Sequence, residues 1–248
     1  MQGPGMQSVS AQTVSTQGNV LFMLKAVIFD FDGVIADSEE LHYKALNEVF
    51  KRYGVDVPKA VHWEKYLGYT DHENIMAVSG DYGMGLDDAA VQRLKDQKKI
   101  LFEQLASREA VIIEGVEEFI RRLTAAGLRM AICSGALRTD IDIMLDGAGF
   151  AGRFEVIVSA EDVQKGKPDP EGYLLTLQRL NSTQDPIRPT DCVVIEDSHW
   201  GIEAALAAGM CPVAVTTTYS REQLEGKARK VVNRLDELSV EDLDAICS

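Results

Sequence analysis

Five short apolar runs, rich in β-branched residues, constrain the fold of this chain more than any other feature of its sequence. They cover residues 24–29 (LKAVIF), 128–133 (LRMAIC), 154–158 (FEVIV), 192–195 (CVVI) and 210–215 (MCPVAV). Runs of this length that are apolar on both faces predict strands buried in a parallel sheet. Pro212 weakens the last run or places it near a sheet edge, because proline donates no hydrogen bond to a neighbouring strand.

Helical patterns separate these runs. Apolar residues recur at helical spacing over residues 116–126, 139–147, 171–180 and 200–208. The first and last of these stretches end before Gly127 and Gly209, which are natural C-caps. Strand and helix alternate from residue 128 onward, which predicts βαβ units on one parallel sheet and therefore an α/β fold.

The span from residue 38 to residue 110 breaks this alternation. It holds helical patterns, LHYKALNEVFKRYG and DDAAVQRLKDQKKILFEQLA, and no convincing strand. The simplest interpretation is a helical cap, residues 38–110, inserted after the first strand of a core formed by residues 23–37 and 111–248. Residues 1–22 are rich in Gln, Ser, Thr and Gly and lack a basic start and an apolar centre, so we expect a flexible tail rather than a secretory signal.

The charge and cysteine content exclude several classes of partner. With 39 acidic and 25 basic side chains, the formal net charge is −14. Such a surface repels phosphate backbones and anionic lipids, so we expect no nucleic acid or membrane binding, and no stretch is apolar enough to span a bilayer. We expect buried, reduced thiols in a cytoplasmic protein, because no zinc-like spacing joins the four cysteines, Cys133, Cys192, Cys211 and Cys247. A monomer is the default, because no heptad pattern suggests a partner helix.

Polar side chains follow four of the five predicted strands. In chain order these groups are Asp30-Phe31-Asp32-Gly33, Ser134-Gly135, the loop Lys165-Gly166-Lys167-Pro168, and Glu196-Asp197-Ser198. Ligands of open α/β sheets bind outside the carboxyl ends of the strands. We therefore expect an acid cluster, a hydroxyl and an amine to meet at one site.

This combination of groups suits phosphoryl transfer. A carboxylate attacks an anionic phosphate monoester only where positive charge offsets the repulsion, and Asp30, Glu196 and Asp197 together offer hard oxygen ligands for Mg²⁺. Asp30 is the expected nucleophile, because an aspartyl-phosphate intermediate splits one difficult displacement into two easier ones. Asp32, two residues further on, is expected to protonate the leaving oxygen and then to accept a proton from the incoming water or hydroxyl.

Phosphate binding is expected from two further strand ends. Ser134 and the backbone amides that follow it, beginning with Gly135, would donate hydrogen bonds to the phosphoryl oxygens, and Lys167 would add a fixed positive charge opposite the metal. Each piece also has an ordinary interpretation: a DxDG stretch is a common turn, and Asp197 or Ser198 can simply cap a helix. The prediction rests on their conjunction at the ends of successive buried strands.

In this order the motifs resemble those of the haloacid dehalogenase superfamily, in particular the branch of β-phosphoglucomutase and small sugar-phosphate phosphatases. DFDGVIADS, CSGA, KGKPDP and VIEDSHWGIEAALAAGM are similar to its first to fourth motifs, and the resemblance spans residues 24–233. It implies a Rossmann-like core with the cap inserted after the first motif. It also implies Asp30 as nucleophile, Asp32 as acid and base, and Mg²⁺ held by Asp30, the backbone carbonyl of Asp32 and Asp197, with Glu196 alongside.

Members of this branch differ in the group that accepts the phosphoryl group, which is water in a phosphatase and a sugar hydroxyl in a phosphomutase. His42 resembles a histidine that helps β-phosphoglucomutases control the second aspartate, although it is equally compatible with a surface histidine. In the mutase cap loop a lysine and an arginine flank a glycine, whereas Leu67 and Asp71 stand at those positions around Gly68, and an aspartate repels a distal phosphate. Arg138 is a candidate replacement charge. We predict a phosphatase for a small phosphorylated metabolite, a sugar phosphate above all, with a phosphomutase as the alternative and a non-enzymatic binding protein ranked third.

Overall fold

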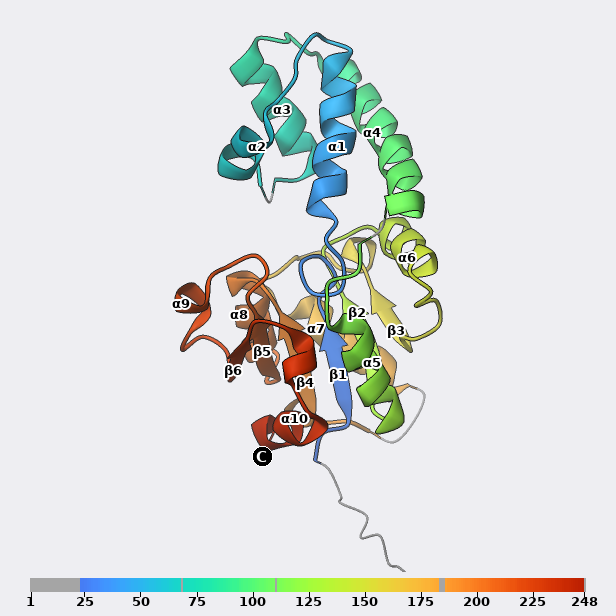
Figure 1. The fold of residues 1–248 in the computed structure, drawn as a ribbon, viewed down its shortest axis with the longest axis vertical. Coiled ribbons are helices and arrows are strands. Elements are labelled where there is room, and N and C mark those ends of the chain that lie inside the picture. Colours follow the sequence, from blue (N-terminus) through green and yellow to red (C-terminus); the bar gives the residue numbers. More distant parts are fainter. Residues whose placement is uncertain (1–22, 68, 110, 183–185, 248) are drawn as a thin grey trace, which may run out of the picture.

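The computed structural model describes residues 23–67, 69–109, 111–182 and 186–247, and within them the chain forms a six-stranded parallel sheet beneath a group of helices (Figure 1). The strand order is β3-β2-β1-β4-β5-β6, and each neighbouring pair is parallel. The strands are β1 (Ala26–Phe29), β2 (Arg129–Cys133), β3 (Val156–Val158), β4 (Cys192–Glu196), β5 (Cys211–Val215) and β6 (Lys230–Val232). The predicted tail, residues 1–22, lies outside the described residues.

All five predicted strands are present, and β6 is an addition. Pro212 lies inside β5 opposite Val194, and only β6 lies beyond β5, so the proline is one strand from the edge of the sheet. Its carbonyl accepts a hydrogen bond of 2.9 Å from the backbone N–H of Arg229. The sequence signal for β6 is weak, because this strand has three residues and begins with a lysine.

Helices cover both faces of the sheet, because alternate residues of each buried strand face opposite sides. Val27 and Phe29 pack with α5 and α6 on one face, and Ala26 and Ile28 pack with α7 and α8 on the other. Gly127 and Gly209, which follow the ends of α5 and α8, have φ of +70° and +75°, as expected for helix C-caps. The core helices are α5 (Val116–Ala125), α6 (Arg138–Gly147), α7 (Glu171–Asn181), α8 (His199–Ala207), α9 (Arg221–Leu224) and α10 (Val240–Cys247).

Four further helices follow β1 and stand beyond the carboxyl ends of the strands (Figure 1). They have their own apolar core, which includes Phe50, Ile75 and Leu94, and this is the inserted helical cap that the sequence predicts. The long last helix returns the chain to the sheet and packs against α6. The exact division at residues 38 and 110 stays a prediction. The cap helices are α1 (Glu39–Lys51), α2 (Lys59–Lys65), α3 (Asp71–Tyr82) and α4 (Asp88–Glu109).

The four cysteines all fall in the described part of the chain, where each is buried and outside any disulfide, as expected for reduced thiols. Among the helices described, none combines the length and the apolar character that a membrane crossing requires.

Candidate active site

The central strands bring an acid cluster together at one edge of the sheet. β1 and β4 are neighbours in parallel register, with Phe29 opposite Ile195, so Asp30 after β1 and Glu196 at the end of β4 emerge side by side. The backbone N–H of Asp30 donates to the carbonyl of Ile195 at 2.9 Å and continues the ladder by one residue. All three acids, with Asp197 as the third, are buried. The predicted convergence of strand ends therefore holds for these carboxylates.

The acid cluster has a donor set that fits a hard divalent cation. One carboxylate oxygen from each of Asp30, Glu196 and Asp197 lies within 4.8 Å of the others. Burial raises the pKa of Asp30 well above its ordinary value, against the lowering effect of Lys167. Burial, followed by the charge of Glu196, raises the pKa of Asp197 to about 7. Such crowding is relieved when a cation displaces the protons, and oxygen ligands of this kind suit Mg²⁺.

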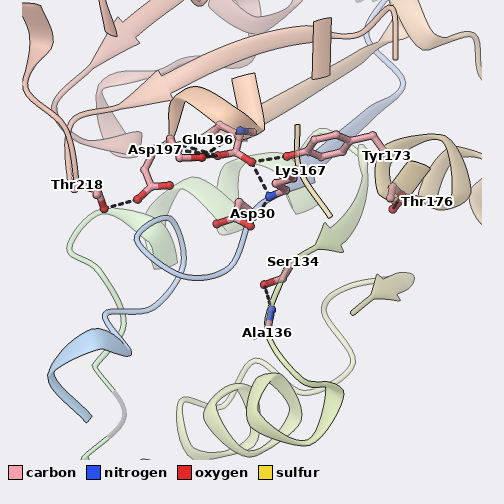
Figure 2. Close-up of polar contacts among 12 residues, drawn as sticks. Asp30, Ser134, Ala136, Lys167, Tyr173, Thr176, Glu196, Asp197 and Thr218 are labelled. Atoms are coloured by element: carbon pink, nitrogen blue, oxygen red, sulfur yellow. Dashed lines mark hydrogen bonds and ion pairs between the residues drawn. The ribbon is translucent and has the colours of Figure 1, made fainter. Parts of the chain in front are cut away.

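Lys167 lies between two of the acids (Figure 2). Its Nζ is 2.5 Å from Oδ1 of Asp30 and 2.6 Å from Oε1 of Glu196. Burial works to lower the pKa of this ammonium, but the two carboxylates outweigh burial and raise the pKa well above its usual range. Lys167 is therefore a fixed positive charge beside the candidate nucleophile.

Hydrogen bonds to both carboxylate oxygens hold the Glu196 side chain in place. Its Oε1 accepts from Lys167 and from the phenolic hydroxyl of Tyr173, the latter at 2.6 Å. Its Oε2 accepts from the backbone N–H of Asp197, at 3.2 Å, and from the hydroxyl of Ser198, at 3.0 Å. The Ser198 hydroxyl also accepts from the N–H of Gly201, so Ser198 is the N-cap of α8, one of the two alternatives that the sequence left open. Sequence reasoning did not predict a role for Tyr173. The only indication in the sequence is that this tyrosine lies on the buried face of the helix that follows Lys167.

Two glycines allow this close packing. A Cβ on Gly201 would lie 1.8 Å from the carboxyl carbon of Glu196, and a Cβ on Gly33 would lie 2.0 Å from Oδ2 of Asp197. Gly33 also has a φ of +77°, which other residues rarely adopt. A fifth strand end contributes as well, because Thr218, after β5, donates a hydrogen bond to Oδ2 of Asp197 (Figure 2). Thr218 was missed because its segment carries no family motif.

Asp32 lies where the loop after β1 turns toward the cap. It is half-buried and accepts a hydrogen bond from the hydroxyl of Ser38. Burial raises its pKa to about 6, against the lowering effect of the Ser38 hydrogen bond. A carboxyl group with this pKa can donate and accept a proton near neutral pH, which is what a general acid–base requires.

Ser134 follows β2 on the other side of β1. Its backbone N–H continues the ladder to Val158 at 2.9 Å, and its Oγ accepts from the N–H of Ala136 at 3.0 Å. Among the residues that the structure describes, no acceptor pairs with the Oγ–H, so this hydrogen is left to donate, as a phosphoryl ligand would need. Ser134, Gly135 and Lys167 all line a small cavity of about 210 Å³, so these three predicted phosphate-binding residues share one space.

A larger cavity of about 730 Å³ lies between the cap and the core. Asp32, His42 and Gly135 line it together with residues of α3, α4 and α6. Arg138 is not among its lining residues: it is exposed, and its Nε is 2.9 Å from Oδ2 of Asp142 on the same helix. Gly68 falls outside the described residues.

His42 has a partner that sequence reasoning missed. The Nζ of Lys98, on α4, is 2.7 Å from Nδ1 of His42 and 2.9 Å from Oδ1 of Asp71, and only 3% of the Lys98 side chain is exposed. Burial, followed by the charge of Lys98, lowers the pKa of His42 well below its ordinary value, so the imidazole is neutral. The signal was available in the sequence: Lys98 falls four residues from Leu94 and four from Phe102, on the apolar side of a predicted helix.

Comparisons with known proteins place this fold and site in a family. The family described as haloacid dehalogenase-like hydrolase matches residues 27–215, and the chain belongs to it. Protein CbbY of Rhodobacter capsulatus is 35% identical over 213 residues, which cover 80% of this chain and 88% of the relative. The phosphorylated carbohydrates phosphatase of Thermotoga maritima is 31% identical over 189 residues, which cover 75% and 82%.

A solved structure extends the likeness to the whole fold. A CbbY variant from Rhodobacter sphaeroides, crystallised with xylulose 1,5-bisphosphate, superposes with a TM-score of 0.76 and 25% sequence identity. The match covers 89% of this chain and 99% of that chain. The predicted superfamily is thus confirmed, as are the parallel Rossmann-like core and the inserted cap.

Proposed function

We propose that this protein is a magnesium-dependent phosphatase that hydrolyses a small phosphorylated metabolite, a sugar phosphate above all, through an aspartyl-phosphate on Asp30. The observation that carries the proposal is the position of the Asp30 carboxylate, 2.5 Å from a partly buried ammonium and within reach of two further acids. A nucleophile for an anionic substrate needs positive charge beside it, which Lys167 supplies in part and a divalent cation held by the acids would complete. The names of the relatives, a phosphatase of phosphorylated carbohydrates among them, support the same reaction and substrate class.

The metal would be held by Asp30, Asp197 and the backbone carbonyl of Asp32, with Glu196 alongside. When bound, Mg²⁺ neutralises the acid cluster and the phosphate charge. Asp30 would attack phosphorus, forming a new P–O bond while the ester P–O bond breaks. Asp32 would give its proton to the leaving oxygen, and it would then take a proton from the water that attacks the aspartyl-phosphate. That second step releases inorganic phosphate and restores the Asp30 carboxylate.

Two side chains and one backbone amide would hold the phosphoryl oxygens during both steps. Lys167 would pair with one oxygen by displacing part of its contact with Asp30, and Ser134 would donate its free hydroxyl hydrogen. The backbone N–H of Gly135 would add a third donor, as predicted from the sequence. Removing a donor of this type typically lowers turnover by a factor of about 10² to 10³.

The proposal is tested by incubating the protein with Mg²⁺ and p-nitrophenyl phosphate. We expect release of p-nitrophenol that EDTA abolishes and that Asp30→Asn eliminates. Asp142→Asn is the matched control that retains activity, since Asp142 is an acid of α6 with about half of its side chain exposed. Activity that survives Asp30→Asn would refute the assigned nucleophile. A complete lack of turnover with p-nitrophenyl phosphate and with a panel of sugar phosphates would favour the non-enzymatic binding protein.

A phosphomutase is the second candidate, because His42 and Asp32 line the same cavity. A mutase returns the phosphoryl group to a sugar hydroxyl instead of water. The two reactions are separated by supplying β-glucose 1-phosphate with a trace of the 1,6-bisphosphate. Accumulation of glucose 6-phosphate would establish the mutase, whereas free phosphate alone would establish the phosphatase.

A further inference from the structure

We propose that Thr217 and Thr218, in the loop after β5, are positioning residues for the metal site. Their hydroxyl groups hold the carboxylate of Asp197 and the turn at Gly33 in the arrangement that binds a divalent cation. This inference rests on the proposed function and adds two residues that lie outside the four motifs of the sequence. Neither threonine would touch the metal or the substrate, because each acts through a neighbouring group.

The carboxylate of Asp197 is held at one of its two oxygens. Thr218 donates a hydrogen bond from its hydroxyl group to Oδ2 of Asp197 (Figure 2). The backbone of Gly33 lies against the same oxygen, because a Cβ on Gly33 would lie 2.0 Å from this Oδ2 and 3.0 Å from Oγ1 of Thr218. Three segments, which follow β1, β4 and β5, therefore meet at Oδ2 and fix the orientation of the carboxylate.

Thr217 holds the turn that carries the backbone ligand proposed for the metal, the carbonyl of Asp32. The hydroxyl group of Thr217 donates to the carbonyl of Gly33, and the N–H of Gly33 donates to the carbonyl of Ala36 at 2.8 Å. A trans peptide unit is planar, with its C=O directed away from its N–H. The hydrogen bond of the Gly33 N–H therefore also sets the direction of the Asp32 carbonyl, and Thr217 holds the next peptide unit.

The loop that carries the two threonines is anchored to the last strand of the sheet. The backbone N–H of Thr216 donates to the carbonyl of Val232 at 3.0 Å, which continues the ladder between β5 and β6. The hydroxyl group of Thr216 donates to Oδ1 of Asn233 at 3.2 Å, and this oxygen also accepts from the guanidinium group of Arg221 at 3.2 Å. A loop anchored in this way can keep its hydroxyl groups in fixed positions, as the orientation of a metal ligand requires.

A ligand that is held in position before the metal arrives binds the metal more tightly, because less conformational freedom is lost on binding. Groups that orient metal ligands typically contribute a factor of about 10 to 100 to metal affinity. Thr218 is exposed, so water can replace part of its hydrogen bond, and we expect the lower value, about tenfold. Thr217 acts on the backbone one peptide unit away from the Asp32 carbonyl, and we expect a factor of about three.

Calorimetric titration of the full chain with Mg²⁺, without substrate, tests the proposal. Thr218→Val keeps the shape of the side chain and removes the hydroxyl group, so Mg²⁺ should bind about tenfold more weakly. Thr218→Ser keeps the hydroxyl group and should restore binding to within about twofold of wild type. Thr217→Val should weaken binding about threefold. The matched control is Thr190→Val, at an exposed threonine just before β4 and so at the opposite end of the sheet, which should leave Mg²⁺ binding unchanged.

Two further measurements separate positioning from a general loss of structure. The urea midpoint of Thr218→Val in EDTA should stay close to that of wild type, because the exposed hydroxyl group contributes little without the metal. The Mg²⁺ concentration that gives half-maximal release of p-nitrophenol should rise about tenfold, and added Mg²⁺ should restore most of the lost turnover. A purely structural role would instead lower the midpoint and leave the Mg²⁺ concentration unchanged.

Several outcomes would overturn the inference. Wild-type Mg²⁺ binding in Thr218→Val would show that the hydroxyl group is dispensable, and tighter binding would show that it competes with the cation for Oδ2 of Asp197. Equal losses in Thr218→Val and Thr218→Ser would assign the side chain to packing. If Thr218→Val does not fold, Thr217→Val decides the matter, with Thr217→Ser as its rescue.

The metal titration needs no turnover, so it separates this inference from the proposed function. A chain that binds Mg²⁺ with the predicted differences but releases no p-nitrophenol would refute the phosphatase and support the positioning role of the two threonines. A wild-type chain that binds no Mg²⁺ would overturn the positioning role as well.

Discussion

Removal of divalent metal should leave a protein that is less stable at pH 7.5 than at pH 5, because buried acids at the site retain protons in the folded state. Burial raises the pKa of Asp32 from 3.8 to about 6 and that of Asp197 to about 7. In the unfolded chain both groups ionise near 3.8. The stability that such a group contributes is fully present below its unfolded pKa and is lost as pH rises through its folded pKa. Surface acids whose pKa is lowered, such as Glu118 at about 2, are ionised in both states above pH 5 and do not contribute to this change.

Asp32 allows the magnitude to be worked out. Its shift of about two units corresponds to about 3 kcal/mol in full, and about 1.4 kcal/mol of this is lost between pH 5 and pH 7.5. His42 acts in the opposite direction, because burial lowers its pKa and the folded protein gains stability as pH rises toward 6.5. The difference in unfolding free energy between wild type and Asp32→Asn cancels this contribution, since His42 is present in both proteins.

Urea unfolding followed by circular dichroism, in EDTA at pH 5, 6 and 7.5, measures this difference. We expect the advantage of wild type over Asp32→Asn to shrink by about 1.4 kcal/mol across the series. Excess Mg²⁺ should reverse the pH dependence of the wild type itself, because the metal binds ionised carboxylates. A wild-type advantage that stays constant or grows with pH would refute the reasoning that desolvation controls the titration of Asp32.

Three further substitutions test how the site is built. Lys167→Met keeps the volume of the side chain but leaves two buried carboxylates without their cation. The unfolding free energy should therefore fall by about 3–5 kcal/mol, and turnover of p-nitrophenyl phosphate should fall at least about a hundredfold. Near-normal kinetics would contradict this. Tyr173→Phe removes one hydrogen bond to a charged acceptor and should cost about 1.5–3 kcal/mol in urea unfolding, whereas an unchanged midpoint would mean that the hydroxyl does not help to hold Glu196. Gly201→Ala should lower the unfolding free energy by about 1–3 kcal/mol and lower turnover, because its Cβ would overlap Glu196. The control is Gly80→Ala at a helical glycine with open space around its Cβ, which should be neutral or stabilising. Equal effects of the two substitutions on thermal unfolding would contradict the packing argument.

The sheet was predictable because its strands are continuous apolar runs that end at polar residues. The acid cluster was predictable for the same reason: Asp30 and Glu196 follow two such runs directly, and the strand order makes them neighbours. β6 was not predicted, because its three residues begin with a lysine and follow a charged stretch, whereas β3, which is equally short, lies in the longer apolar run 154–158. The monomeric state and the cytoplasmic location stay predictions.

Sequence reasoning predicted much less about the cap side of the site. Which charges face the cavity depends on how α3, α4 and α6 pack, and no local pattern records this. Arg138 lies two residues after the second motif, yet its side chain pairs along its own helix with Asp142. Lys98 is 35 residues from the nearest motif and still reaches His42. Contacts of this kind between helices are set by tertiary packing, so the sequence indicates them only through a charged residue on the apolar face of a helix.

The formal charges at the edge of the sheet indicate the order in which metal and substrate would bind. Three carboxylates and one ammonium, Lys167, leave a formal charge of −2 in a buried space, which one divalent cation balances. Without that cation Asp30 and Asp197 would keep protons, as their raised pKa values indicate, and Asp30 would be a poor nucleophile for the proposed reaction. With the cation bound the centre is neutral, and a phosphate dianion can approach it. The proposed mechanism therefore predicts that the metal binds before the substrate, and that the crowding of the acids is the source of the affinity for the metal.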